Sequence, residues 1–128
     1  MKITSAIARY LLGALFLFAG SNHVHPFLPM GKLPTGPAGD YLNGMLATGY
    51  FVVVGFFEAL PAILLLINRY VPFALTVLAA VITNILVVDV LMFHQALPVG
   101  ALLVILWLLT AWRVRAVFFS LLEQPAHD

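Results

Sequence analysis

The stretch Tyr50–Ile67 reads YFVVVGFFEALPAILLLI, and Glu58 is its only charged residue. After residues 68–70 comes a second apolar stretch, Val71–Val88, which has no charge at all. A membrane-spanning helix needs about 20 mostly apolar residues, and each stretch reaches that length once a few flanking residues are added. Because the connection between them is so short, the two helices are predicted to be antiparallel neighbours.

Two further apolar stretches flank this pair: Ile3–Ser21, in which Arg9 is the only charge, and Ala96–Trp112, which has none. Of the 128 residues, 63% are hydrophobic and 9% are charged, whereas a soluble domain is about half apolar and a quarter charged. This number of charged residues is too small to cover the surface of a soluble protein. We therefore expect a lipid bilayer to surround the chain. The sequence predicts an all-α integral membrane four-helix bundle, a single membrane domain with spans at about residues 3–22, 49–67, 71–90 and 96–116.

The first stretch has a second interpretation. Lys2 and Arg9, an apolar run and the small residues at 19–21 are also typical of a cleaved secretory signal peptide. The charge distribution described next favours a retained helix.

The lysines and arginines predict the orientation. Cytoplasmic loops of membrane proteins are enriched in these residues. Four spans put five of them on one side and leave only Lys32 on the other; the five are Lys2, Arg9, Arg69, Arg113 and Arg115. The sequence therefore predicts a multi-pass protein of the cell (inner) membrane with both termini in the cytoplasm.

The connection Asn22–Gly49 is long and rich in proline and glycine, so its first half is not expected to form a regular helix. Its second half differs, because apolar residues recur at helical spacing from Pro37 to about Ala47. Two interpretations stay open: a short interfacial helix before the second span, or simply the first turns of that span.

Polar residues inside the apolar stretches are the candidate site. Ionisable groups at bilayer depth are costly and often functional. Glu58 lies on the small-residue side of its helix, with Gly55, Ala59 and Ala62. By depth we expect Glu58 to meet Asn84 in the bundle centre, with Arg9 as a third member.

Two roles are open for this cluster. It can be a polar clasp that holds the helices in register, or it can bind the head of a small hydrophobic ligand or relay protons. Asp89, near the end of the third stretch, is expected to lie apart from the cluster at the outer boundary.

Other chemistry is less well supported. His23, His25 and His94 are expected on one side of the membrane, where Asp89 or Asp40 could join them, but their spacing matches no known site and we predict no tight metal. The net charge of +1 and the lack of a basic run argue against a nucleic-acid partner. The chain has no cysteine, which excludes a thiol relay within it.

An ordered set of short segments resembles the DoxX family of small four-helix membrane proteins. The segments are Arg9–Gly13 with Phe16 and Gly20, then 36–39, 47–51, Glu58 with 64–66, 69–72 and 84–86. The resemblance implies a four-helix bundle and a link to membrane-bound redox systems, since DoxX-like chains include relatives of thiosulfate:quinone oxidoreductase subunits. Two segments depart from the family: Asp89 replaces a frequent histidine, and residues 59–62 lack the usual glycines.

Three functions follow as hypotheses. The first is a membrane subunit of a quinone-linked redox system, which binds a non-covalent quinone and depends on a soluble or membrane redox partner, because nothing in the sequence suggests that it is catalytic alone. The second is a non-enzymatic scaffold or assembly factor. The third is a small transporter, which would require oligomerisation.

Overall fold

The computed structural model describes residues 2–124, and these residues form an all-α structure. Its elements in chain order are α1 (Lys2–Val24), α2 (Pro37–Thr48), α3 (Tyr50–Leu66), α4 (Val71–Leu91), the 3₁₀ turn η1 (His94–Ala96), α5 (Leu97–Ala111), the 3₁₀ turn η2 (Trp112–Val114) and α6 (Arg115–Ser120). The all-α prediction is confirmed.

Three of the described helical segments are long and apolar enough to cross a membrane on their own: α1, α4 and the continuous run His94–Ser120. A fourth is reached if α2 and α3 together count as one broken span, since the two helices meet at an angle of 83°. The predicted long apolar helices are therefore present. The fourth differs from the others because the chain bends sharply at its start.

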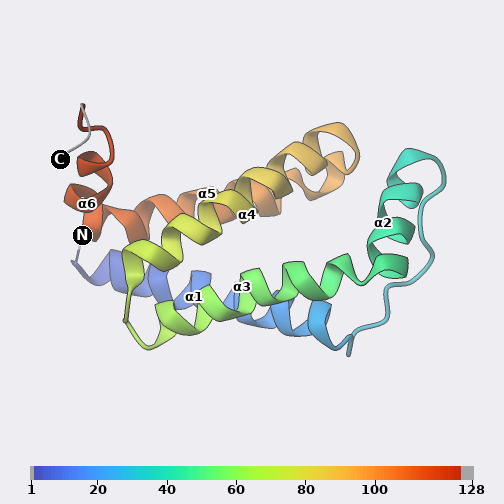
Figure 1. Ribbon diagram of the computed structural model, residues 1–128, viewed down its shortest axis with the longest axis horizontal. Helices are drawn as coiled ribbons and strands as arrows, with labels where there is room; N and C mark the ends of the chain where they lie inside the picture. Colours follow the sequence, from blue (N-terminus) through green and yellow to red (C-terminus); the bar gives the residue numbers. More distant parts are fainter. Residues whose placement is uncertain (1, 125–128) are drawn as a thin grey trace.

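The four long helices pack as an antiparallel bundle (Figure 1). In this arrangement α1 contacts α3 and α5, while α4 contacts the same two helices from the other side. The start of α1 and the end of α5 lie at the same end of the bundle, together with the α3–α4 turn. The opposite end carries α2 and the α4–α5 turn.

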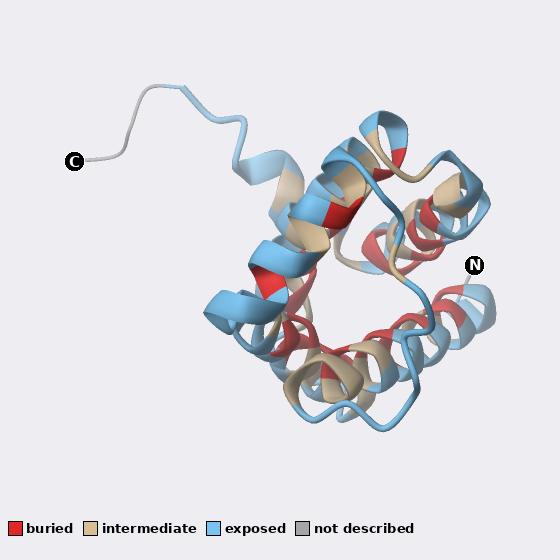
Figure 2. Ribbon diagram, turned by 90° about the vertical axis from the view of Figure 1, so that its right-hand side faces the viewer, coloured by how far each residue is buried: buried red, intermediate tan, exposed pale blue. Residues whose placement is uncertain are grey.

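The core lies between the long helices. Figure 2 shows the buried residues facing inward and the exposed residues facing outward around the bundle. The core side chains are aliphatic and aromatic and come from α1, α3, α4 and α5; the largest fully buried ones are Leu12, Phe16, Leu65, Leu75 and Leu78. An apolar outer surface over these helices is what lipid contact requires.

Small residues bring α1 and α3 into close contact. A Cβ atom added to Gly20 would lie 2.6 Å from the carbonyl oxygen of Gly55, and a Cβ on Gly55 would lie 2.7 Å from that of Gly20. Gly13 is similarly close to Ala62 and Leu66. The predicted small-residue face of Glu58 is thus the face that packs against α1, as close helix packing in membranes demands.

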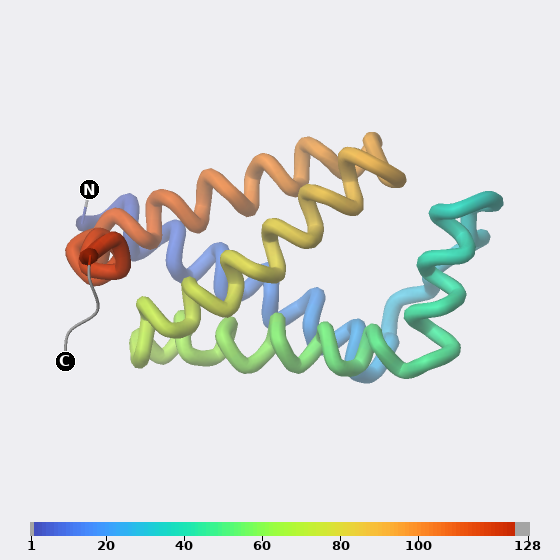
Figure 3. Tube along the Cα trace, turned by 45° about the horizontal axis from the view of Figure 1, so that its top comes forward, coloured from blue at the N-terminus to red at the C-terminus, as the bar shows by residue number. Residues whose placement is uncertain are grey.

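The α3 and α4 helices behave differently. They lie close together at the short turn that connects them, and they diverge toward the end of the bundle where α2 lies, as the trace in Figure 3 shows. Gly49 connects α2 to α3 in the left-handed conformation, with φ 78° and ψ 11°, which glycine adopts without steric cost. The α2 segment is therefore a separate short helix, bent by 83° from α3, and not a straight continuation of it.

Candidate functional site

The buried side chain of Glu58 forms a hydrogen bond with a histidine. Nδ1 of His23 lies 2.6 Å from Oε1 of Glu58, and Glu58 is only 2% exposed. Which of the two atoms donates depends on the histidine tautomer. In either direction the hydrogen bond reduces the cost of burying the carboxyl group between helices.

The close contact of α1 with α3 explains why these side chains meet. His23 follows Gly20 by one helical turn on α1, and Glu58 follows Gly55 by one turn on α3. The two helices run in opposite directions, and helical side chains lean toward the amino end of their own helix. Each side chain therefore leans back across the glycine contact toward the other.

His23 is further held by the ring of Phe51, which stacks on the imidazole with a centroid separation of 5.1 Å. This histidine was predicted only as a group at the membrane boundary. The α1 helix continues to Val24, past the predicted end of the apolar stretch, and so carries His23 into the bundle.

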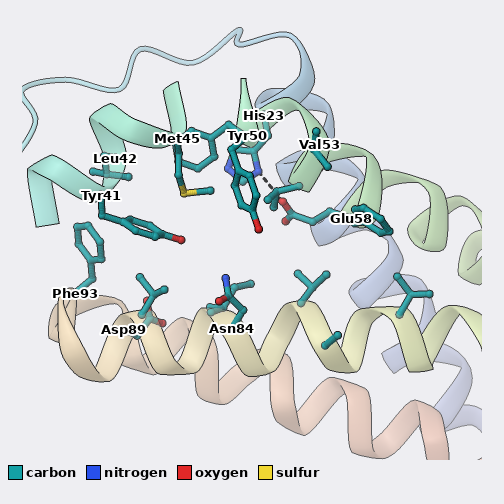
Figure 4. Close-up of a pocket in the computed structure, with 18 residues that line it drawn as sticks. His23, Tyr41, Leu42, Met45, Tyr50, Val53, Glu58, Asn84, Asp89 and Phe93 are labelled. Atoms are coloured by element: carbon teal, nitrogen blue, oxygen red, sulfur yellow. Dashed lines mark hydrogen bonds and ion pairs between the residues drawn. The ribbon is translucent and has the colours of Figure 1, made fainter. Parts of the chain in front are cut away.

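The space between the diverging helices α3 and α4 is a cavity of about 560 Å³. We call it the α3–α4 cavity. The α2 helix contributes Tyr41, Leu42 and Met45 to its wall, and Figure 4 shows these side chains facing α4 across the opening. The polar residues that line it are His23, Tyr41, Tyr50, Glu58, Asn84 and Asp89, and the remaining lining residues are aliphatic, aromatic or Met45.

Asn84 lies on the wall opposite Glu58. Both line the α3–α4 cavity, and Figure 4 shows their side chains pointing into it from α4 and α3. The predicted direct contact between them is wrong, because Glu58 bonds with His23 instead. The divergence of α3 and α4 leaves the two side chains on opposite walls of the cavity (Figure 4).

Arg9, the third predicted member, lies elsewhere. Its guanidinium donates a hydrogen bond from Nη1 to the backbone carbonyl of Leu65 and lies over the ring of Tyr10. It therefore ties α1 to the other end of α3 and does not line the α3–α4 cavity.

Asp89 is buried, with 6% of its surface exposed, and it lines the same cavity as Glu58 and Asn84, so the expectation that it lies apart from them is wrong. It also packs against Gly100 of α5, where an added Cβ would lie 3.2 Å from its Oδ2. The small size of Gly100 makes room for the carboxyl group between the two helices.

Two further histidines within residues 2–124 are exposed: His25 follows α1 and His94 begins η1. Within residues 2–124, no three His, Cys, Asp or Glu side chains are grouped closely enough to hold a metal ion.

Comparison with models of known protein families, with curated proteins and with solved structures found no match. No family is therefore identified for this chain, and the resemblance to the DoxX family stays a prediction.

The site thus combines an apolar cavity of ligand size with polar groups on facing walls. Cavities that bind small molecules usually have about 300–1,000 Å³ and a few polar groups in an otherwise apolar lining. The hydrogen-bonded His23 and Glu58 side chains place two groups that can exchange protons in one wall of the cavity. The arrangement is suited to holding a flat or elongated apolar molecule with one or two oxygen atoms.

Proposed function

We propose that this chain is a membrane protein that binds a small, largely apolar molecule in the α3–α4 cavity and holds its polar head with the His23–Glu58 pair. The single observation that carries the proposal is the hydrogen bond of the buried Glu58 to the partly exposed His23 in the wall of a mostly apolar cavity. A purely structural clasp has no need of an open cavity beside it. A ligand site needs both.

A quinone is the ligand that these groups suit best. Its two carbonyl oxygens lie at opposite ends of a flat ring, and both accept hydrogen bonds. The cavity offers donors on facing walls, namely the Nε2–H of His23, the ring nitrogen not bonded to Glu58, in the form that carries this hydrogen, and the amide N–H₂ of Asn84. The aromatic rings of Tyr41 and Tyr50 line the same space and can pack against a flat ring.

This reading extends the resemblance to DoxX-like chains, which suggests a quinone-linked redox system. In such a system the present chain would bind the quinone, and a soluble or membrane redox partner would supply the electrons. The binding residues proposed here are Glu58 and Asn84, as expected from the sequence, together with His23.

We also propose that both termini are cytoplasmic. In support, the five basic residues that predict this orientation belong to α1, the α3–α4 turn and the end of α5 with α6, which lie at one end of the bundle (Figure 1). The α3–α4 cavity and α2 would then lie toward the outer face. Reporter fusions at Lys32 and after Ser120 should report opposite sides, and the same side for both would contradict the orientation.

Ligand binding is tested by mass spectrometry of organic extracts from the gently purified protein. The wild-type chain is expected to retain a quinone or a similar lipid in near-stoichiometric amount. The variant Ala80→Phe fills the cavity from α4 and should reduce the retained amount about tenfold or more, since a ring of this size displaces the ligand.

The matched control is Ala101→Phe, because Ala101 is an exposed alanine on α5 that does not line the cavity. This variant should retain the ligand like the wild type. If the wild type retains no small molecule, or if both variants retain equal amounts, the proposed function fails. A stably associated protein chain without any small molecule would favour the scaffold hypothesis instead.

A further inference from the structure

A second pocket lies at the end of the bundle opposite α2 and is unrelated to the α3–α4 cavity. It has a volume of about 220 Å³ and lies where α1 meets the α3–α4 turn and the end of α5. We call it the basic pocket, and its polar lining residues are Lys2, Ser5, Arg9, Asn68, Thr110 and Arg113.

The lining of the basic pocket has positive charge and no negative charge. Three of its residues are Lys or Arg, and none is Asp or Glu. Three cations around one small space repel one another, so an anion between them would stabilise the arrangement. Positive charge at a membrane surface can be a topology signal alone, and a second observation is therefore needed.

Ser5 supplies that observation. It is 2% exposed, and its hydroxyl oxygen has no hydrogen-bond partner among residues 2–124. A buried polar group without a partner is destabilising, so such groups are rare unless something else satisfies them. Ser5 lies on the same face of α1 as Lys2 and Arg9, and all three line the pocket.

The other donors are partly used by the protein. Arg9 gives one N–H to the carbonyl of Leu65, and Thr110 donates to the carbonyl of Leu106 at 2.8 Å. The hydroxyl of Ser5, the ammonium of Lys2 and the guanidinium of Arg113 are left to face a ligand. All three line the same pocket, and several donors in one small space are what a tetrahedral oxyanion requires.

We infer that the basic pocket binds a phosphate group. The group can belong to the head of an anionic phospholipid, whose chains would run along the outside of the bundle, or it can be free phosphate. Guanidinium and ammonium groups bind phosphate oxygens strongly, and basic pockets between membrane helices are suited to lipid headgroups. The site is independent of any ligand in the α3–α4 cavity.

The experiment is native mass spectrometry of the full chain in detergent, titrated separately with dioleoylphosphatidylglycerol, dioleoylphosphatidylcholine and inorganic phosphate. Phosphatidylglycerol is expected to bind about five times more tightly or better than zwitterionic phosphatidylcholine. If inorganic phosphate fails to displace it, the ligand is a lipid headgroup. If millimolar phosphate binds and displaces it, the site takes free phosphate. Both results support a phosphate site.

Variants locate the binding. Ser5→Ala changes no charge and removes an unpartnered hydroxyl, so the variant should fold normally, yet it should bind about three to ten times more weakly because the anion loses one donor. Arg113→Gln should weaken binding about tenfold. The matched control is Arg115→Gln, since the Arg115 guanidinium lies over the Trp112 ring and outside the pocket; its binding should stay within about twofold of the wild type.

Three results would overturn the inference. The first is equal binding of the two lipids together with no binding of phosphate. The second is that Ser5→Ala and Arg113→Gln bind as the wild type does. The third is that Arg115→Gln is as impaired as these two variants, since general surface charge would then explain the effect.

Discussion

The two sides of α3 form opposite kinds of contact. Toward α1 the helix presents Gly55, whose backbone touches that of Gly20 so closely that no Cβ atom fits between them. Toward α4 it presents Val54 and Phe57, and beyond the shared turn these side chains face an open cavity instead of a neighbouring helix. One side of α3 is closed and the other is open.

The difference shows how one helix can hold a polar group in place and still leave room for a ligand. The closed side fixes the distance between α1 and α3, and this distance lets His23 reach Glu58. The open side leaves the same pair accessible from the cavity. Stability and binding therefore depend on different faces of α3, and substitutions on the two faces should have separable effects.

The largest effect is expected on the closed side. Gly55→Ala would place a Cβ 2.7 Å from the carbonyl oxygen of Gly20, and a backbone atom cannot move aside as a flexible side chain can. We expect the free energy of unfolding, measured by titration with a denaturing detergent, to fall by about 3 kcal/mol, the upper end for overpacking. Gly44→Ala on α2 is the control, because a Cβ there meets nothing within 4 Å, and it should not be destabilising.

An intermediate effect is expected for the polar pair itself. Glu58→Leu removes the bond to His23 and should lower the free energy of unfolding by about 1–2 kcal/mol, as for other hydrogen bonds between membrane helices. Glu58→Gln keeps the shape and one hydrogen bond, so its stability should stay within about 0.5 kcal/mol of the wild type.

A double-mutant cycle isolates this contact. The losses for Glu58→Leu and His23→Leu should be clearly less than additive when combined, since both remove the same bond. Additive losses would mean that the two side chains do not interact in the folded protein.

The smallest effect on stability is expected on the open side. Ala80 lines the α3–α4 cavity from α4, so Ala80→Val adds two methyl groups to empty space. The free energy of unfolding should change by less than about 0.5 kcal/mol, in contrast to the single methyl group added by Gly55→Ala. A loss as large as that of Gly55→Ala would show that α3 and α4 are closed together.

The sequence predicted the helices because long uncharged stretches and small-residue periodicity are local properties. It placed Gly55, Ala59 and Ala62 on the side of Glu58, and the structure packs Gly55 and Ala59 against Gly20 of α1. It also placed Glu58 and Asn84 at similar depth, which is a matter of counting residues along two helices.

The partner of Glu58 could not be predicted in the same way. Whether the side chains of α3 contact those of α4 along their whole length depends on the angle between the two helices. This angle cannot be predicted from the periodicity of the sequence. His23 was missed because it follows the apolar stretch, where the end of α1 could not be located. The spacing of His23 from Gly20, equal to that of Glu58 from Gly55, was a usable signal once the two glycines were known to touch.

Photolabelling with an azido-substituted quinone, followed by peptide mapping, tests the central claim most directly. The claim is that an apolar ligand binds on the open side of α3 and reaches His23–Glu58. Labels are predicted on residues of the cavity wall such as Met45 and Val81, and unlabelled quinone should suppress them. Labels confined to outward-facing residues such as Leu102 and Ile105 of α5, unaffected by unlabelled quinone, would contradict the account.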